Sequence, residues 1–238
     1  MVEMIKVSAP GKLMLFGDHA VVHDRSCIVT AVDHRISVSL DKRKDNKIVL
    51  DAPDMNIKNY IISLNDLGKQ HPKKVRFVLT AIKNFFEKYK IESGLNVKTK
   101  SEFSSEFGLG SSSAVTVSTL KALSELFRIE MNNKKLFDLS YKTVLDIQDV
   151  GSGFDVAAAI YGGTLYFVTG GKVIEPINIK ELPLVVGYTG IKADTSTLVK
   201  MVYRKLSEEP GIINKNFDDI ARIVDEARIE IQRNNWKK

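Results

Sequence analysis

Short apolar runs separated by polar clusters dominate the first hundred residues of the chain. β-Branched and other apolar residues concentrate at positions 5–8, 13–16, 27–32, 36–40, 48–50 and 95–99. Glycine, aspartate and lysine separate several of these runs, and short runs with such boundaries are typical of β-strands. The pattern predicts a sheet in which the early strands form antiparallel pairs.

Elsewhere the apolar residues recur at intervals of three and four, which places them on one face of a helix. This spacing predicts helices over residues 74–89, 111–127, 135–148 and 154–161, and two more centred on residues 198–206 and 217–231. Gly162 and Gly163 end the Ala-rich fourth helix. Residues 164–168 and 184–188 are predicted as strands. Strands intermixed with helices, with antiparallel pairs early in the chain, indicate the α+β class.

The composition is that of a globular chain with a core of its own. It has 238 residues, of which 44% are hydrophobic, and this length fits one or two domains. We find no apolar run of the roughly 20 residues that a membrane helix needs and no signal-peptide pattern, so we expect a cytoplasmic protein with no membrane partner. The single cysteine, Cys27, lies in an apolar run, which favours a buried thiol.

Positive charge exceeds negative charge by six, with 35 lysines and arginines against 29 aspartates and glutamates. An excess of this sign attracts nucleotides, acidic metabolites or nucleic acid. The lysines are scattered and are not interleaved with aromatic residues, as they would be on an RNA-binding face. We therefore interpret the charge as solvated surface and expect no nucleic-acid partner.

A glycine-rich segment, Gly108-Leu109-Gly110-Ser111-Ser112-Ser113, directly precedes the second predicted helix. Glycines let the backbone approach an anion, and the free N–H groups of a first helical turn point at that anion. Serine hydroxyls can bind phosphate oxygens or Mg²⁺. The segment fits neither the P-loop nor the dinucleotide pattern. A nucleotide-phosphate site is one interpretation, and a plain glycine turn with serine N-caps is the other.

Two further segments favour the nucleotide-phosphate site over the plain glycine turn. Residues 8–22 read SAPGKLMLFGDHAVV, and residues 151–159 read GSGFDVAAA before the double glycine. Together with the serine loop they resemble the motifs of the GHMP kinases, most closely the mevalonate kinases, and they occur in the family's order. Residues 188–195, YTGIKADT, resemble the start of the family's C-terminal domain. The resemblance covers essentially the whole chain.

This resemblance implies an ATP- and Mg²⁺-dependent phosphotransferase that acts on the hydroxyl of a small acidic substrate, mevalonate, in isoprenoid biosynthesis. Residues 151–159 are more similar to phosphomevalonate kinases, so phosphomevalonate, or the substrate of another GHMP kinase, is the alternative acceptor. The implied fold is an N-terminal domain like the second domain of ribosomal protein S5 over residues 1–178. A partial ferredoxin-like C-terminal domain over residues 179–238 follows it.

The third glycine-rich motif of the family has no counterpart in these 238 residues. Three interpretations remain open: a longer natural chain, a short member whose site is completed differently, or a nucleotide-binding protein without turnover. An RNA-binding module of the S5 type is a further hypothesis, which rests on fold analogy and basic charge. A homodimer is also left open.

The resemblance implies roles for individual residues. Asp155 would orient or deprotonate the acceptor hydroxyl, and Lys12 beside it would stabilise the developing charge. Asp18 and His19 stand where mevalonate kinases usually read Glu-His and would bind substrate, as would Thr189. The alternatives are a surface ion pair for Lys12, a helix N-cap for Asp155 and a structural role for His19.

The same resemblance implies the metal ligands. Mg²⁺ would be held by a loop serine, Ser111 or Ser112, and by one carboxylate. Asp146 is similar to a family position that usually carries glutamate, and the alternative is a plain surface aspartate.

Overall fold

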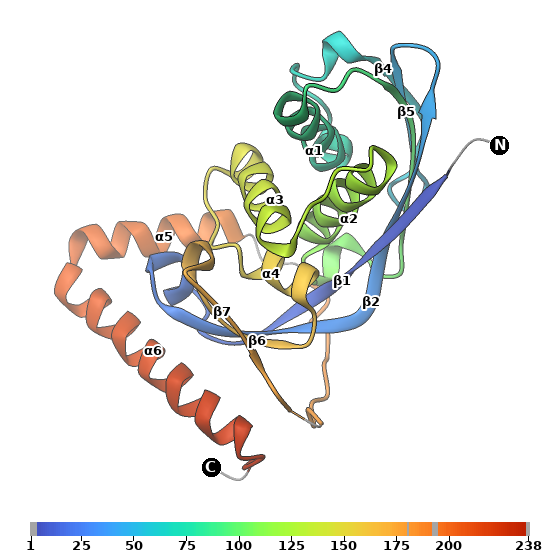
Figure 1. The fold of residues 1–238 in the computed structure, drawn as a ribbon. Helices are drawn as coiled ribbons and strands as arrows, with labels where there is room; N and C mark the ends of the chain where they lie inside the picture. Colours follow the sequence, from blue (N-terminus) through green and yellow to red (C-terminus); the bar gives the residue numbers. More distant parts are fainter. Residues whose placement is uncertain (1–3, 180, 192–194, 237–238) are drawn as a thin grey trace.

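The computed structural model describes residues 4–179, 181–191 and 195–236 (Figure 1). Seven strands form one sheet within these ranges, in the order β4-β3-β5-β2-β6-β7 with β1 paired to β2. The strands are β1 (Ile5–Phe16), β2 (Ser26–Arg43), β3 (Lys47–Ala52), β4 (Ile57–Ser63), β5 (Gly94–Ser101), β6 (Thr164–Val168) and β7 (Val173–Ile177). All pairs are antiparallel except β3 with β5. The α+β prediction is confirmed.

The long strand β2 organises the sheet. It pairs with β1 over most of its length, with β6 from Ser26 to Thr30 and with β5 from Ile36 onward. Residues 33–35, between these two pairings, are exposed. This polar interruption explains why the sequence predicts two strands, at 27–32 and 36–40, where the chain forms one. The two runs predicted in β1 are likewise one strand, with a register shift between Pro10 and Lys12.

The strand predictions were wrong at three places. Strands β4 and β7 were not predicted, and β7 contains Pro176, which is tolerated because β7 is an edge strand of the sheet. Residues 184–188 were predicted as a strand but form none, and Val185 is fully exposed there. An apolar run becomes a strand only where a neighbour supplies ladder hydrogen bonds, and composition does not reveal that neighbour.

Four helices cover one face of the sheet, and their predicted bounds agree with the structure to within two residues. They are α1 (Lys73–Tyr89), α2 (Ser111–Leu126), α3 (Asn133–Gln148) and α4 (Phe154–Tyr161). Helix α2 packs against β1 and β2 as well as against α1, α3 and α4, so most of its serine and threonine side chains beyond the first two residues are buried. Ser118 Oγ donates to the Ile36 carbonyl of β2 at 3.0 Å, and Thr116 Oγ1 donates to the Ser112 carbonyl at 2.8 Å. These bonds pair hydroxyl groups that would destabilise the fold if they were buried without a partner.

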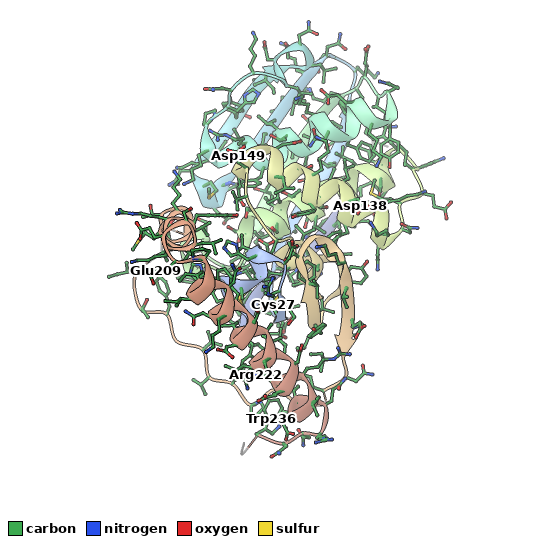
Figure 2. All side chains as sticks on the ribbon, turned by 90° about the vertical axis from the view of Figure 1, so that its left-hand side faces the viewer. Cys27, Asp138, Asp149, Glu209, Arg222 and Trp236 are labelled. Carbon is green, nitrogen blue, oxygen red and sulfur yellow. The ribbon has the colours of Figure 1, made fainter. Side chains whose placement is uncertain are left out.

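The last two helices, α5 (Thr195–Glu208) and α6 (Pro210–Gln232), were also predicted. Helix α6 packs on the opposite face of the sheet, where Val224 and Ile231 contact Ile28 and Ile177. Alternation along β2 explains the two faces, because Ile28 points to α6 while Cys27 and Val29 point into the main core. Figure 2 shows α6 between the labels of Glu209, just before its start, and Trp236, just after its end, with Arg222 on the helix. Within the described residues, none of the helices has the length and apolar character that a membrane span requires.

Candidate active site

The glycine-rich loop joins a short 3₁₀ turn, η4 (Ser105–Phe107), to the N-terminus of α2. Gly108 and Gly110 both adopt left-handed conformations, with φ of 72° and 73°. The first intrahelical hydrogen bond runs from the Ala114 N–H to the Gly110 carbonyl at 3.0 Å. The N–H groups of Ser111, Ser112 and Ser113 therefore have no acceptor inside the helix. This is the geometry of an anion-binding helix N-terminus.

Lys12 connects strand β1 to this loop. It lies beside the register shift between β1 and β2, where the regular pairing of the two strands is interrupted. The Lys12 backbone N–H donates to the Leu109 carbonyl at 2.9 Å, and Nζ donates to the Gly108 carbonyl at 3.0 Å. The bond from Nζ goes to a backbone carbonyl, so the surface ion-pair alternative does not describe this contact. Strand β1 and the loop approach each other closely at Gly11. A Cβ on this residue would lie only 2.8 Å from the Leu109 carbonyl oxygen, so glycine permits the contact.

Asp155 lies in the first turn of α4, beside the same loop. A Cβ built on Gly110 would lie 2.9 Å from Lys12 Cγ and 3.6 Å from Asp155 Cβ. The structure therefore brings Lys12 and Asp155, 143 positions apart in the chain, next to the same point beside Gly110. Phe154 also contributes, because Lys12 Nζ lies 5.1 Å from its ring centroid, a contact that the sequence did not reveal.

The N-terminus of α4 is fixed by packing. Its N-cap is Gly153, with φ of 92°, so the alternative in which Asp155 is the N-cap is excluded. A Cβ on Gly153 would lie 3.1 to 3.2 Å from the rings of Tyr141 and Phe137, which is tighter than an ordinary contact, and the positive φ also favours glycine. Asp155 Oδ1 accepts a hydrogen bond from the Val156 N–H at 3.0 Å.

Three predicted site residues, Lys12, Asp18 and Asp155, all lie close enough to Cys27 for their charges to act on it. Burial raises the pKa of the Cys27 thiol, the negative charges of Asp155 and Asp18 raise it further, and Lys12 opposes them. A thiol in this state is not a nucleophile at neutral pH. Burial and the charge of Asp155 also raise the pKa of Tyr141, whose hydroxyl donates to the Gly151 carbonyl at 2.7 Å. Sequence reasoning missed Tyr141, which looks like any other aromatic residue on an amphipathic helix.

Asp18 and His19 form a turn between β1 and the short 3₁₀ helix η1 (Ala20–His23). Asp18 Oδ1 accepts a hydrogen bond from the His19 N–H at 3.0 Å. The Asp18 side chain is exposed, and His19 is half-buried. Gly17, at the start of the turn, has φ of 94°, and a Cβ there would lie 2.5 Å from the Ser26 carbonyl oxygen.

We expect Gly17→Ala to lower the free energy of unfolding by more than about 2 kcal/mol, because the new methyl group meets backbone that cannot move aside. Gly170→Ala is the matched control: its φ is also positive, at 70°, but no atom lies within 4 Å of the added Cβ. The control should cost only the left-handed backbone penalty of about 1–2 kcal/mol. Urea titration of both variants measures the difference, and equal losses would contradict the steric argument.

Two predicted residues have other surroundings. Asp146 lies in the last turn of α3, where Oδ2 accepts hydrogen bonds from Asn84 Nδ2 at 2.8 Å and Lys142 Nζ at 2.6 Å. Burial alone would raise the pKa of Asp146, but these hydrogen bonds outweigh it and lower the pKa. Among the described residues, side chains of His, Cys, Asp and Glu form no cluster of three that could hold a metal. A site built from serines, one carboxylate and phosphate oxygens would not be of that kind.

Thr189 is exposed, and its Oγ1 donates to the Ile191 carbonyl at 3.4 Å. The ring centroid of the preceding residue, Tyr188, lies 5.0 Å from that of Phe107, the residue directly before Gly108. The segment that carries Thr189 therefore contacts the start of the glycine-rich loop. The rest of the predicted motif, residues 192–194, lies outside the described residues.

Known proteins are similar to this chain in sequence and in architecture. The family model of the GHMP kinases N terminal domain matches residues 76–163. A mevalonate kinase of Thermococcus sibiricus is 33% identical over 232 residues, which cover 94% of this chain and 69% of the relative. A mevalonate kinase of Pyrococcus abyssi is 33% identical over 236 residues, covering 96% and 70%. The crystal structure of the Methanococcus jannaschii mevalonate kinase matches with a TM-score of 0.74 at 26% identity, covering 95% of this chain and 72% of that chain.

These findings agree with the site geometry. The matched family segment contains the glycine-rich loop and Asp155, and the alignments to the two archaeal relatives extend over nearly all of the chain. The resemblance seen in the three ordered motifs is confirmed. The chain belongs to the mevalonate kinase family of the GHMP kinases.

Proposed function

We propose that the protein transfers the γ-phosphoryl group of ATP to the hydroxyl of mevalonate. The observation that carries this proposal is the meeting of Lys12, Gly110 and Asp155 at the N-termini of α2 and α4. Phosphoryl transfer depends mainly on positioning and on neutralising charge, and this arrangement offers a cation, backbone amides and a carboxylate within one small region. The identity to curated mevalonate kinases supports the choice of acceptor.

The loop suits a polyphosphate. Three free N–H groups and the positive end of the α2 dipole would meet the phosphate oxygens, and Gly108 and Gly110 present no Cβ to obstruct them. Ser113 Oγ is buried without a hydrogen-bond partner among the described residues, which leaves a donor at the same turn.

Ser111 or Ser112, together with Asp146, would hold Mg²⁺, because hard oxygen donors suit this ion. When bound, the ion would neutralise phosphate charge. Asp146 would have to exchange its bonds to Asn84 or Lys142 in order to ligate it.

The acceptor would lie between α4 and the Asp18–His19 turn. Asp155 would orient the attacking hydroxyl and accept its proton, and Lys12 would stabilise the charge that develops on the reacting oxygens. Asp18, His19 and Thr189 would bind the rest of the substrate, with His19 as a hydrogen-bond donor to its carboxylate.

A coupled assay of ADP release from the 238-residue protein tests the function. We expect the highest kcat/KM with mevalonate when phosphomevalonate, homoserine and galactose are compared at equal concentrations. Preference for phosphomevalonate would favour the alternative acceptor. ADP release that mevalonate does not increase would reject the proposal, and calorimetric binding of Mg²⁺·ATP in that case would favour a nucleotide-binding protein without turnover.

Replacing the loop serine that holds the metal should weaken the binding of Mg²⁺·ATP by about tenfold or more, since even outer-shell partners of a metal contribute 10–100-fold to affinity. Calorimetry on Ser111→Ala and Ser112→Ala measures this, and the variant with the larger loss identifies the ligand. Ser124→Ala is the control, because that hydroxyl lies at the far end of α2 and donates to the Lys121 carbonyl. Unchanged affinity in both loop variants would mean that the serines serve only the fold.

A further inference from the structure

The turn that carries Asp18 and His19 leads into η1, a short helix with a strained residue at each end. Helix η1 has only four residues, and short 3₁₀ turns have poor hydrogen-bond geometry. The residues at both of its ends have positive φ, 60° for His19 and 60° for Asp24. Neither is glycine, so each conformation is strained and persists only where the surroundings impose it.

An aromatic cluster from the C-terminal helices supplies one part of these surroundings. The His23 ring is stacked on Phe217 of α6, with centroids 4.3 Å apart and an angle of 15° between the planes. Tyr203 of α5 meets the same ring edge-on at 4.9 Å. Burial lowers the pKa of His23, and the nearby charges of His19 and Arg25 lower it further, against a smaller opposite effect of Asp24. A neutral ring suits this packing.

Arg25 joins η1 to α6 through an ion pair with Asp218. Its Nη1 donates to the His23 carbonyl at 2.9 Å, while Nε donates to Asp218 Oδ1 at 2.8 Å. The Asp218 side chain is 66% exposed. An ion pair as exposed as this contributes little to global stability, but together with the bond to the His23 carbonyl it joins η1 directly to α6.

The segment after β6 also binds η1 and the residue that follows it. Thr169 Oγ1 donates to the Val21 carbonyl, and Lys172 Nζ donates to Asp24 Oδ1 at 2.8 Å. Helix η1 is therefore held by the segment after β6, and His23 and Arg25 link it to α5 and α6.

We propose that α5 and α6 hold the Asp18–His19 turn in its substrate-binding position through His23 and Arg25, which are positioning residues for the acceptor. The inference rests on the proposed function, because it assigns the turn to acceptor binding. It does not involve the nucleotide loop, whose contacts to Lys12 come from β1 upstream of the turn.

Calorimetric titration with mevalonate and steady-state kinetics on His23→Ala and Arg25→Met test the proposal. We expect Kd and KM for mevalonate to rise by about tenfold or more, because small misplacement of binding groups is costly. The ATP affinity should stay within about twofold, because the α2 N-terminus is untouched. His23→Phe keeps a ring for Phe217 and should restore most of the mevalonate affinity.

Arg228→Met is the matched control. Arg228 also joins α6 to the sheet, by an ion pair to Glu175 of similar exposure, but it does not contact η1. Hydrogen exchange of the amides of residues 17–24 should be faster in His23→Ala and unchanged in Arg228→Met.

The outcomes separate the inference from the proposed function. Mevalonate binding without turnover in the unmutated protein would reject the kinase activity and leave the inference standing if His23→Ala weakens that binding. Unchanged mevalonate affinity and KM in His23→Ala and Arg25→Met would overturn the inference while the activity stands. Absence of mevalonate binding in the unmutated protein would overturn both.

Discussion

Asp155→Asn should reduce phosphoryl transfer to mevalonate by about 10²–10⁴-fold, the usual contribution of a general base. The substitution keeps the size of the side chain and its ability to accept the Val156 N–H, so α4 should remain intact. It removes the negative charge that would orient the acceptor hydroxyl and take its proton. Single-turnover measurements at saturating ATP and mevalonate would isolate this step from binding.

Two measurements accompany this variant. The free energy of unfolding should change by no more than about 1 kcal/mol, and ATP affinity should be retained. Asp138→Asn is the control, since Asp138 pairs with Lys134 within α3 at an exposed position. Near-normal turnover in Asp155→Asn would remove this residue from the chemistry.

Lys12→Met should reduce turnover by about 10²–10³-fold, the effect of removing one group that stabilises charge in the transition state. Methionine preserves the length of the aliphatic stem that packs on Gly110 but has no charge to offer the reacting oxygens. ATP binding should change little, because the backbone bond from the residue 12 N–H to the Leu109 carbonyl survives the substitution and continues to hold the loop.

Steady-state kinetics together with ATP calorimetry check this expectation. Lys98→Met is the control, as an exposed lysine on strand β5 of the same sheet. A variant at position 12 that keeps its kcat would show that Lys12 only supports the loop. A parallel loss of ATP affinity and kcat would mean that Nζ is needed to keep the Gly108 carbonyl in place.

Helices α1 to α4 could be predicted from sequence to within two residues. Their apolar residues recur at three and four, and this signal is local to each helix. The strand predictions were weaker, since β4 and β7 were missed and residues 184–188 were assigned wrongly. Whether an extended segment joins a sheet depends on a partner elsewhere in the chain.

The candidate site also has a part that local sequence determines and a part that depends on distant contacts. The sequence by itself determined the glycine-rich turn before α2 and the presence of Asp155 in the first turn of α4, because glycine conformation and helix periodicity are properties of neighbouring residues. It also carried the three ordered motifs that identify the family.

Only the tertiary structure decided which of these residues meet. The register shift of β1 against β2 and the packing of α4 bring Lys12 and Asp155 together at Gly110, while Asp146 is bound by Asn84 of α1. The contacts of His23 and Arg25 with α6 join segments nearly 200 positions apart in the chain, as the separation of 193 between Arg25 and Asp218 shows. Such contacts depend on strand register and on which face each helix buries, and no periodicity in the sequence encodes the pairing of distant segments.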